Sequence, residues 1–431
     1  MSSVPRERLG LTRLGRALSV GLAMSPALAG AQGADAQWTQ WGGPDRNFRV
    51  AAAPLASEWP ASGPRTLWRR PLGHGDSAIV ADSDTLYTMY RRDDDHEVVV
   101  ALDRTTGTTR WEHAYPAPLW EGFRGNQGKG PRATPIVVGD RVCAIGVGAR
   151  LTCLDCRSGE LRWTRGLWEH YHVDPSKYGP SDRGFAASPL ALGNRLISVA
   201  GGPGHAVTAL DLDDGGVIWA SLDYEISYAS PILIEVGGQQ QLVFFLADRV
   251  VGVSPANGAR LWEHPHVTDF SMNACTPVWG PDGVLFVSSG YGVGSRGLRL
   301  RLANGRTEVE QLWFNSKVHV MHGSAVRVGD VIWASSGDLG PAFLVGVRAR
   351  SGEEVARMRG FAKANLVASG ERLVLLDEEG VLGLVSIEGE RPVVLGQAPL
   401  LSPRAWVVPT LVGTTLYARD RKEIVAVDLG R

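Results

Sequence analysis

The amino-acid sequence predicts an all-β fold, an eight-bladed β-propeller of four-stranded antiparallel blades, from three observations. A hairpin motif with a fixed Gly and Trp recurs at intervals of roughly 45–55 residues, the spacing of repeats that each supply four strands. A small-residue landmark before an apolar run recurs along the same chain. A last copy of the hairpin motif is split between the chain ends, which predicts a ring closed by an N-terminal strand.

The hairpin motif is clearest at residues 101–111, A-L-D-R-T-T-G-T-T-R-W. The Asp side chain can accept a backbone N–H in the turn and Gly tolerates a positive φ, so this stretch is predicted to form the tip of a hairpin with the Trp on the outgoing strand. A sixth copy, ending at Gly352, lacks the Trp. The motif residues are Asp103, Gly107 and Trp111; Asp155, Gly159 and Trp163; Asp211, Gly215 and Trp219; Ser254, Gly258 and Trp262; and Trp313 of a looser fifth copy.

Each predicted blade opens with a small residue followed by Pro or Ala, just before its innermost strand. An apolar run and a turn such as Gly139-Asp140 follow most of these landmarks. A degenerate unit around residues 365–386 completes the eight openings. The landmarks are Ser77-Ala78, Thr134-Pro135, Ser188-Pro189, Ser230-Pro231, Thr276-Pro277, Ser324-Ala325 and Val408-Pro409.

The eighth hairpin motif is divided between the two ends of the chain. Its first half, through Asp428, is near the C-terminus, and its second half, with Trp68, is near the N-terminus. Pairing of the two halves would close the ring and remove open sheet edges that favour aggregation. The predicted propeller therefore comprises residues 59–431, after an N-terminal extension at residues 30–58.

The first 29 residues have the features of a cleaved signal peptide. Four Arg residues precede the apolar stretch 17–28, and Ala27-Leu28-Ala29 is a small-residue cleavage site. An amphipathic N-terminal arm is the alternative. No Cys lies near the cleavage site, so no lipid anchor is expected, and the mature chain is predicted to be periplasmic or secreted.

Charge and hydropathy exclude two classes of partner. The chain of 431 residues has 44 Lys and Arg against 45 Asp and Glu, so it has no basic excess to bind nucleic acid. After residue 40 there is no apolar run of about 18 residues, so no membrane span is expected.

The four cysteines are predicted to be buried small residues. Cys153 and Cys156 have C-x-x-C spacing, but residues three apart on a strand lie about 10 Å apart on opposite faces, beyond the reach of a disulfide. Arg157 follows instead of the His of a c-type haem site. Redox or metal use of this pair is the alternative. The other two cysteines are Cys143 and Cys275.

The A-x-D-x-x-T-G-x-x-x-W hairpin, repeated in this way, resembles the pyrroloquinoline-quinone (PQQ)-type repeat of eight-bladed propellers. That repeat occurs in quinoprotein alcohol dehydrogenases, in the propeller lipoprotein of the outer-membrane barrel-assembly machinery, and in exported bacterial PQQ-binding-like proteins. The segment W-T-Q-W-G-G-P-D-R-N at residues 38–47 is similar to the N-terminal signature of the exported group. The resemblance covers residues 38–431, and it implies that each Trp docks between neighbouring blades against a Gly turn.

The resemblance does not extend to the cofactor site of the dehydrogenases. Those enzymes typically hold PQQ with calcium, using adjacent cysteines, a Trp beneath the cofactor and a Glu/Asn/Asp set, whereas this sequence has no adjacent Cys pair. We therefore expect no cofactor, with PQQ and calcium as the alternative. No metal site is expected either, and the acidic loop at residues 93–97 is predicted to be a solvated hairpin tip, with cation binding as its alternative. The closely spaced histidines are His170 and His172, His264 and His266, and His319 and His322.

The candidate site lies where the innermost strands begin, at one mouth of the channel. Long insertions at residues 116–130 and 168–184 precede two of these strands, and loops on one face are where repeat proteins usually bind. Such a rim suits a small polar ligand or a peptide strand, and ordinary channel packing is the alternative. The predicted rim residues are Arg132, Tyr228, Asn273, His322 and Trp406.

Taken together, these features predict an exported, monomeric, non-catalytic propeller that acts as a binding or protein-interaction scaffold. A PQQ-dependent alcohol or sugar dehydrogenase and a scaffold for outer-membrane protein assembly are the two alternatives. Both alternatives follow from the resemblance.

Overall fold

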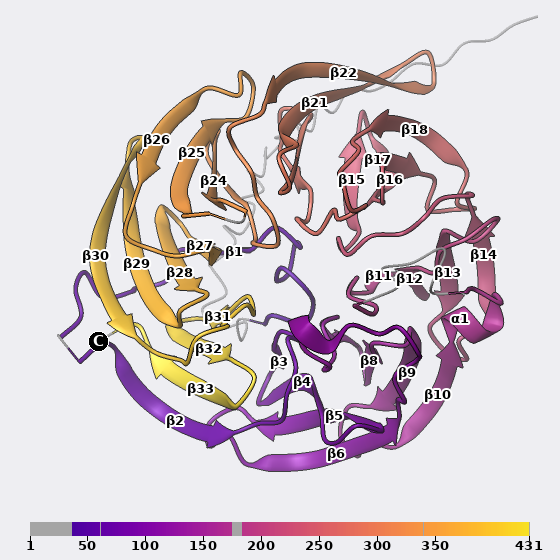
Figure 1. Ribbon diagram of the computed structural model, residues 1–431, viewed down its shortest axis with the longest axis horizontal. Coiled ribbons are helices and arrows are strands. Elements are labelled where there is room, and N and C mark those ends of the chain that lie inside the picture. Colours follow the sequence, from indigo (N-terminus) through magenta and orange to yellow (C-terminus); the bar gives the residue numbers. More distant parts are fainter. Residues whose placement is uncertain (1–36, 61, 175–182, 339, 431) are drawn as a thin grey trace, which may run out of the picture. The chain divides into compact units, whose positions relative to one another are not determined.

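The computed structural model describes residues 37–60, 62–174, 183–338 and 340–430, and the predicted signal peptide lies outside the described residues. Eight sheets follow one another around a central axis in chain order (Figure 1). Consecutive strands pair antiparallel within each blade, with the first strand nearest the axis and the last strand at the rim. The predicted all-β propeller with eight four-stranded blades is confirmed.

The strands divide evenly among the blades, and blade 7 carries one additional short strand. Blades 1 to 4 are β3 (Val80–Asp82), β4 (Thr85–Arg91), β5 (His96–Asp103) and β6 (Thr109–Pro116); β7 (Ile136–Val138), β8 (Arg141–Ile145), β9 (Arg150–Asp155) and β10 (Leu161–Gly166); β11 (Leu190–Leu192), β12 (Arg195–Val199), β13 (Val207–Asp211) and β14 (Val217–Ser221); and β15 (Ile232–Val236), β16 (Gln239–Phe245), β17 (Arg249–Val253) and β18 (Arg260–Pro265).

The second half of the ring follows the same plan. Blades 5 to 8 are β19 (Val278–Trp279), β20 (Val284–Ser289), β21 (Gly294–Ala303) and β22 (Arg306–Asn315); β23 (Val326–Val328), β24 (Val331–Ser336), β25 (Phe343–Arg348) and β26 (Glu354–Met358); β27 (Ala364–Ser369), β28 (Arg372–Asp377), β29 (Val381–Glu388) and β30 (Arg391–Pro399), with β1 (Arg49–Val50); and β31 (Thr410–Val412), β32 (Thr415–Arg419), β33 (Glu423–Asp428) and β2 (Arg65–Pro71). The helical elements in the described ranges are η1 (Gly125–Gln127) and α1 (Leu167–His170). Within those ranges, no helix has the length and apolar character needed to cross a membrane.

Blade 8 is completed by the N-terminal strand β2, which pairs antiparallel with β33 from Arg65 opposite Asp428 to Pro71 opposite Glu423. A register shift between Thr66 and Trp68 places the Trp opposite Ala426. The same shift places Trp111 opposite Ala101 in blade 1. The split motif therefore rebuilds a complete hairpin geometry, and the predicted closure is confirmed.

Five blade-to-blade seams share one contact, in which a rim Trp covers the Gly turn of the next blade. A Cβ added to Gly107, Gly159, Gly215, Gly258 or Gly352 would lie 2.5–2.6 Å from such an indole. Each indole N–H also donates to a backbone carbonyl of that next blade, as Trp163 does to Leu212 at 2.9 Å. The five indoles belong to Trp68, Trp111, Trp163, Trp219 and Trp313.

Trp262 behaves differently from the other motif tryptophans. Its N–H donates to Oε1 of Gln241 in its own blade at 2.7 Å, and nothing lies within 4 Å of a Cβ added to Gly305 in the next blade. The cause is the length of the β21–β22 hairpin in blade 5. In blade 4, the Gly opposite the motif Trp precedes it by ten residues (Gly252 and Trp262), whereas in blade 5 it precedes it by sixteen (Gly297 and Trp313). The turn is thereby carried away from the indole.

The small-residue landmarks connect the innermost strands of neighbouring blades. The Thr134 hydroxyl accepts the N–H of Ala78, the Ser188 hydroxyl accepts the N–H of Thr134, and the Ser230 hydroxyl accepts the N–H of Ser188, at 2.9–3.2 Å. These groups are buried, so the hydroxyls satisfy backbone donors that no ladder strand reaches. A small hydroxyl residue is needed because the blades converge there.

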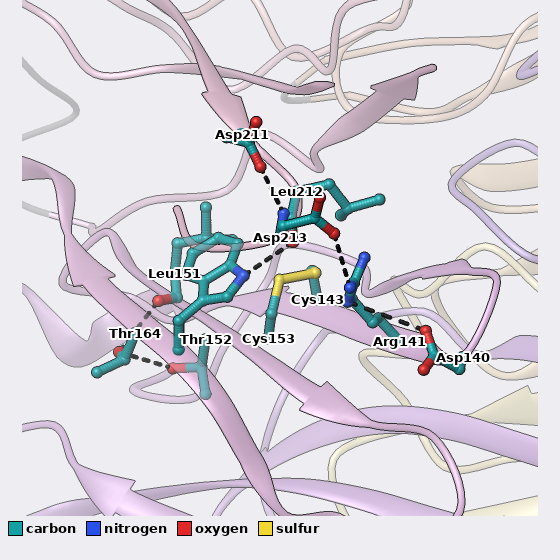
Figure 2. Close-up of a disulfide and its surroundings, with 11 residues drawn as sticks. Asp140, Arg141, Cys143, Leu151, Thr152, Cys153, Thr164, Asp211, Leu212 and Asp213 are labelled. Atoms are coloured by element: carbon teal, nitrogen blue, oxygen red, sulfur yellow. Dashed lines mark hydrogen bonds and ion pairs between the residues drawn. A yellow bond between two sulfur atoms is a disulfide. The ribbon is translucent and has the colours of Figure 1, made fainter. Parts of the chain in front are cut away.

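A disulfide joins Cys143 on β8 to Cys153 on β9 in the core of blade 2 (Figure 2). The sequence analysis predicted only buried small residues, so this pairing is a correction. Cys143 and Cys153 lie directly opposite each other in the β8–β9 ladder, with their Cα atoms 4.1 Å apart. Cys156 and Cys275 are free and buried. The ten-residue separation around the turn at residues 146–149 is the signal that would have revealed the pair.

Candidate functional site

The chain's own N-terminal segment, residues 37–50, bonds to the innermost strands and their landmarks around the axis of the ring, and we call it the channel segment (Figure 1). Trp38 pairs with Ala81 of blade 1, and the Thr39 carbonyl accepts the N–H of Val137 in blade 2. The Trp41 indole donates to Oγ1 of Thr276 at 2.9 Å. Beyond these contacts the segment leaves beneath blade 7 as strand β1, parallel to β27.

Arg46 is the charged group at the centre of this segment, and its side chain is buried. Its guanidinium donates to the carbonyls of Pro189 and Pro231 at 2.9 Å and of Ser188 at 3.2 Å. Burial lowers the pKa of Arg46 to about 9. A single side chain therefore ties the channel segment to blades 3 and 4 through carbonyls next to the Ser-Pro landmarks.

The other end of the channel is the mouth predicted from the sequence. Arg132, Tyr228, Asn273, His322 and Trp406 each lie in the segment just before an innermost strand, so all five belong to this end. His322 and Trp406 are in edge-to-face contact, with ring centroids 5.4 Å apart. The Tyr228 N–H donates to the Asn273 carbonyl at 3.1 Å. The structure thus brings four of the five residues together in two pairs, and Arg132 lies outside both.

Sequence reasoning missed an ion pair at the mouth, between blades 8 and 1. Arg421 donates from Nε and Nη2 to the two carboxylate oxygens of Asp76, each at 2.8 Å, and both side chains are largely buried. The same guanidinium lies 5.0 Å from the centroid of the Trp406 ring. Asp76 directly precedes the Ser77 landmark and could have been found by counting back from it. Arg421 lies in a loop that no landmark marks.

Arg132 is held by backbone carbonyls. Its guanidinium donates to Gly128 at 2.8 Å and to the Arg183 carbonyl, so the loop after η1 wraps around it. Burial lowers the pKa of Arg132, and the nearby Asp76 opposes that effect. No carboxylate within salt-bridge distance of Arg132 occurs in the ranges described. The mouth therefore presents a fixed cation surrounded by carbonyls.

The Asn273 side chain is bonded to the neighbouring backbone and is not exposed to a ligand. Its amide N–H groups donate to the carbonyls of Leu246 and Ala247 at 2.7 and 3.1 Å, and its oxygen accepts the Ser289 hydroxyl. The side chain is fully buried. Asn273 therefore fixes the blade 4–blade 5 connection.

The space beside His322 and Trp406 is small. The cavity measures about 10 Å³ and includes Lys363 and Asn365 in its lining, which is room for about one water molecule. Burial lowers the pKa of His322 to about 4, with the Lys363 ammonium adding to the effect. The His322 ring is therefore neutral at physiological pH, and the mouth offers hydrogen bonds and aromatic edges to a partner.

In the ranges that the structure covers, no group of three or more His, Cys, Asp or Glu side chains could hold a metal ion. His266 is fully buried, and its Nδ1 lies 2.8 Å from an Arg296 nitrogen, which donates to it. Burial lowers the pKa of His266 to about 3, with the Arg296 charge adding to the effect.

His266 gives a defined pH dependence of stability. Its pKa is lower in the folded state than its ordinary 6.5, so the unfolded chain binds more protons between about pH 6.5 and 3. We expect the contribution of the neutral His266 ring to the free energy of unfolding to be fully present above pH 6.5. Below that pH it should be lost, by up to ~1.4 kcal/mol per pH unit. Chemical denaturation of wild type and His266→Gln between pH 7.5 and 4.5 measures this. A stability difference between them that did not change with pH would contradict it.

The acidic loop is solvated only in part, which corrects its prediction. Asp93, Asp94 and Asp95 are exposed at the hairpin tip. Glu97 is fully buried, 3.3 Å from Nη2 of Arg91, and it accepts the Tyr115 hydroxyl at 2.9 Å and the N–H of Val147. Burial raises the pKa of Glu97. This carboxylate connects blade 1 to blade 2 and is closed to solvent cations.

Comparisons with known proteins agree with this geometry. The family described as outer membrane protein assembly factor BamB matches residues 35–179 and 95–357. No curated protein matches the chain in a sequence comparison. The solved BamB from Moraxella catarrhalis has a TM-score of 0.60 and 17% identity, covering 85% of this chain and 99% of that one. A quinohemoprotein alcohol dehydrogenase from Comamonas testosteroni has a TM-score of 0.53 and 11% identity, covering 92% and 81%. At these identities the structural likenesses concern the fold alone.

Proposed function

Because the chain belongs to the family described as outer membrane protein assembly factor BamB, we propose that it is a non-catalytic scaffold of outer-membrane protein assembly, working in the periplasm. The observation that carries the proposal is that the chain's own groups bond to one another at both ends of the channel. The channel segment bonds to residues of the innermost strands and their landmarks, and Asp76 and Arg421 form an ion pair at the mouth. A partner would therefore contact the loops around the mouth instead of entering the channel.

An apolar patch on these loops supports protein binding. Val267 and Phe270 are 64% and 65% exposed on the loop between β18 and β19. The Phe270 ring contacts the Tyr291 ring of the β20–β21 loop edge to face, with centroids 5.2 Å apart. Exposed apolar groups beside polar ones are typical of a protein interaction site. We call these three residues the loop patch.

A photo-crosslinking amino acid at position 270 tests the scaffold. We expect it to crosslink in living cells to a protein of outer-membrane assembly, identified by mass spectrometry. The same amino acid at Leu161, which is 49% exposed on the rim strand β10, should give no such crosslink. Equal labelling from both positions, or none from position 270, would argue against binding through the loop patch.

We also propose that the protein binds no PQQ. The cavity of about 10 Å³ beside Trp406 is far below the ~300 Å³ of an ordinary ligand pocket. The disulfide joins cysteines ten residues apart, on two strands of one blade, instead of adjacent ones. We expect purified protein incubated with PQQ and calcium to show no dye-linked alcohol oxidation above the cofactor-free control. Turnover above that control would overturn the non-catalytic assignment.

A further inference from the structure

A groove of about 520 Å³ lies at the seam between blades 4 and 5, and we call it the seam groove. It is formed where β15 and β19 end, whereas the channel mouth lies where these first strands begin. It is therefore at the opposite end of the ring from the loop patch. Its lining includes Glu235, Gly237, Trp279, Arg301 and Leu302.

The seam groove exists because this seam is built differently from the five that hold an indole against a glycine. Trp262, which would supply the indole, bonds to Gln241 in its own blade instead. The lengthened hairpin leans across the seam, and Leu302 lies so near blade 4 that a Cβ on Gly237 would be 2.8 Å from its Cβ. The space beneath the hairpin remains open.

The walls combine apolar side chains with polar groups, and the charge of Arg301 is partnered by Glu310, 3.9 Å away. Trp279 is partly exposed, and its indole N–H has no hydrogen-bond partner in the described ranges. Glu235 is exposed at one edge and has no cation within salt-bridge distance in those ranges. The volume is that of a site for a compact ligand, and glycines let a ligand approach the backbone closely.

We propose that the seam groove binds an aromatic side chain of a partner polypeptide that has a basic residue next to it. The ring would occupy the apolar space, as indoles occupy the other seams. The Trp279 N–H would donate to a backbone carbonyl of the partner, and Glu235 would pair with the basic side chain. This inference goes beyond the proposed function, because the seam groove lies at the opposite end of the ring from the loop patch.

The test uses N-acetyl-Lys-(5-fluoro-Trp)-amide as the probe and fluorine NMR as the readout on the full-length protein. We expect saturable line broadening, at least threefold weaker binding of the matched Glu-Trp probe, and no competition by N-acetyl-Lys-Ala-amide. The first comparison reports the charge of Glu235, and the second reports the ring. Binding that does not saturate, or that is equal for the Lys-Trp and Glu-Trp probes, would overturn the proposal.

Variants locate the binding on the protein. Leu302→Gln, at a position 37% exposed, removes apolar surface without adding charge and should reduce affinity at least tenfold, and Glu235→Gln should remove the preference for the Lys-Trp probe. Leu161→Gln on β10 is the control and should bind as wild type does. Trp279→Leu provides a second variant of the walls if Leu302→Gln melts at a lower temperature. Unchanged affinity in both wall variants would show that the probe binds elsewhere and would overturn the proposal. The crosslink from position 270 tests the loop patch separately, so that result would leave the proposed function standing.

Discussion

A protein truncated to begin at Gly73 is expected to lose its cooperatively folded state. The truncation removes β2, which pairs with β33 over residues 65–71, and leaves the rim of blade 8 open. It removes the partly buried Trp68 indole from Gly107, where losing a fully buried aromatic would cost at most ~3–5 kcal/mol. It also removes Arg46 and leaves three buried carbonyls unpaired. Because domains are stable by only ~5–15 kcal/mol in total, these losses together should abolish folding, measured by circular dichroism and chemical denaturation.

A circularly permuted control separates the closing strand from the channel segment. Residues 65–72 are fused after Leu429 through a three-residue turn ending in Gly, so that the Gly lies four and Trp68 eight residues after Asp428, as in the other motifs. We expect cooperative melting to return, at a lower temperature than the full chain because Arg46 is still missing. Arg46→Met in the full chain measures how much of the melting temperature depends on Arg46. A simple truncation that melted like the full chain would contradict the role assigned to β2.

The repeat could be predicted from sequence because its geometry is local. Asp103 accepts the N–H groups of Thr105 and Thr106 from within the same turn, at 3.0 and 2.9 Å. Gly107 has φ of 72°, which non-Gly residues rarely adopt. Each copy therefore carries its own turn, and the copies together with the strand-opening landmarks give the number of blades. The closing strand was predictable for the same reason, since β2 and β33 are halves of one copy.

Contacts between distant residues were not predictable in this way. Arg46 bonds to carbonyls about 140 to 190 residues away, and no spacing rule connects an Arg in an N-terminal signature to Pro189. The position of Arg421 beside Asp76 depends on ring closure, which brings residues 345 apart in sequence into contact. For the candidate site, the sequence predicted the end of the channel at which the rim residues lie and the loops that carry them, because the strand beginnings follow from the landmarks. It did not predict that Asn273 would turn inward to Leu246 and Ala247.

Trp163→Ala is expected to destabilise the protein by ~3–5 kcal/mol, because the buried indole fills the seam between blades 2 and 3. The variant also leaves the Leu212 carbonyl without its donor. Chemical denaturation measures the loss, and crosslinking from position 270 should persist in the folded fraction. Loss of the crosslink without loss of stability would instead assign Trp163 a binding role.

Gly215→Ala tests the same seam from the other side, with Gly305→Ala as its matched control. Both glycines have nearly the same φ, 71° and 73°, so both substitutions carry a left-handed backbone cost of ~1–2 kcal/mol. Only the Cβ at position 215 would lie 2.6 Å from an indole, so Gly215→Ala should be the more destabilising change. In the Trp163→Ala background that excess should vanish, because the overlapping ring is gone. The coupling energy of this double-mutant cycle then measures how tightly a rim Trp is fitted to the next blade's turn. Equal costs at positions 215 and 305 in the wild-type background would mean that the turn yields to the added methyl group and that the close fit of indole to glycine adds nothing to stability.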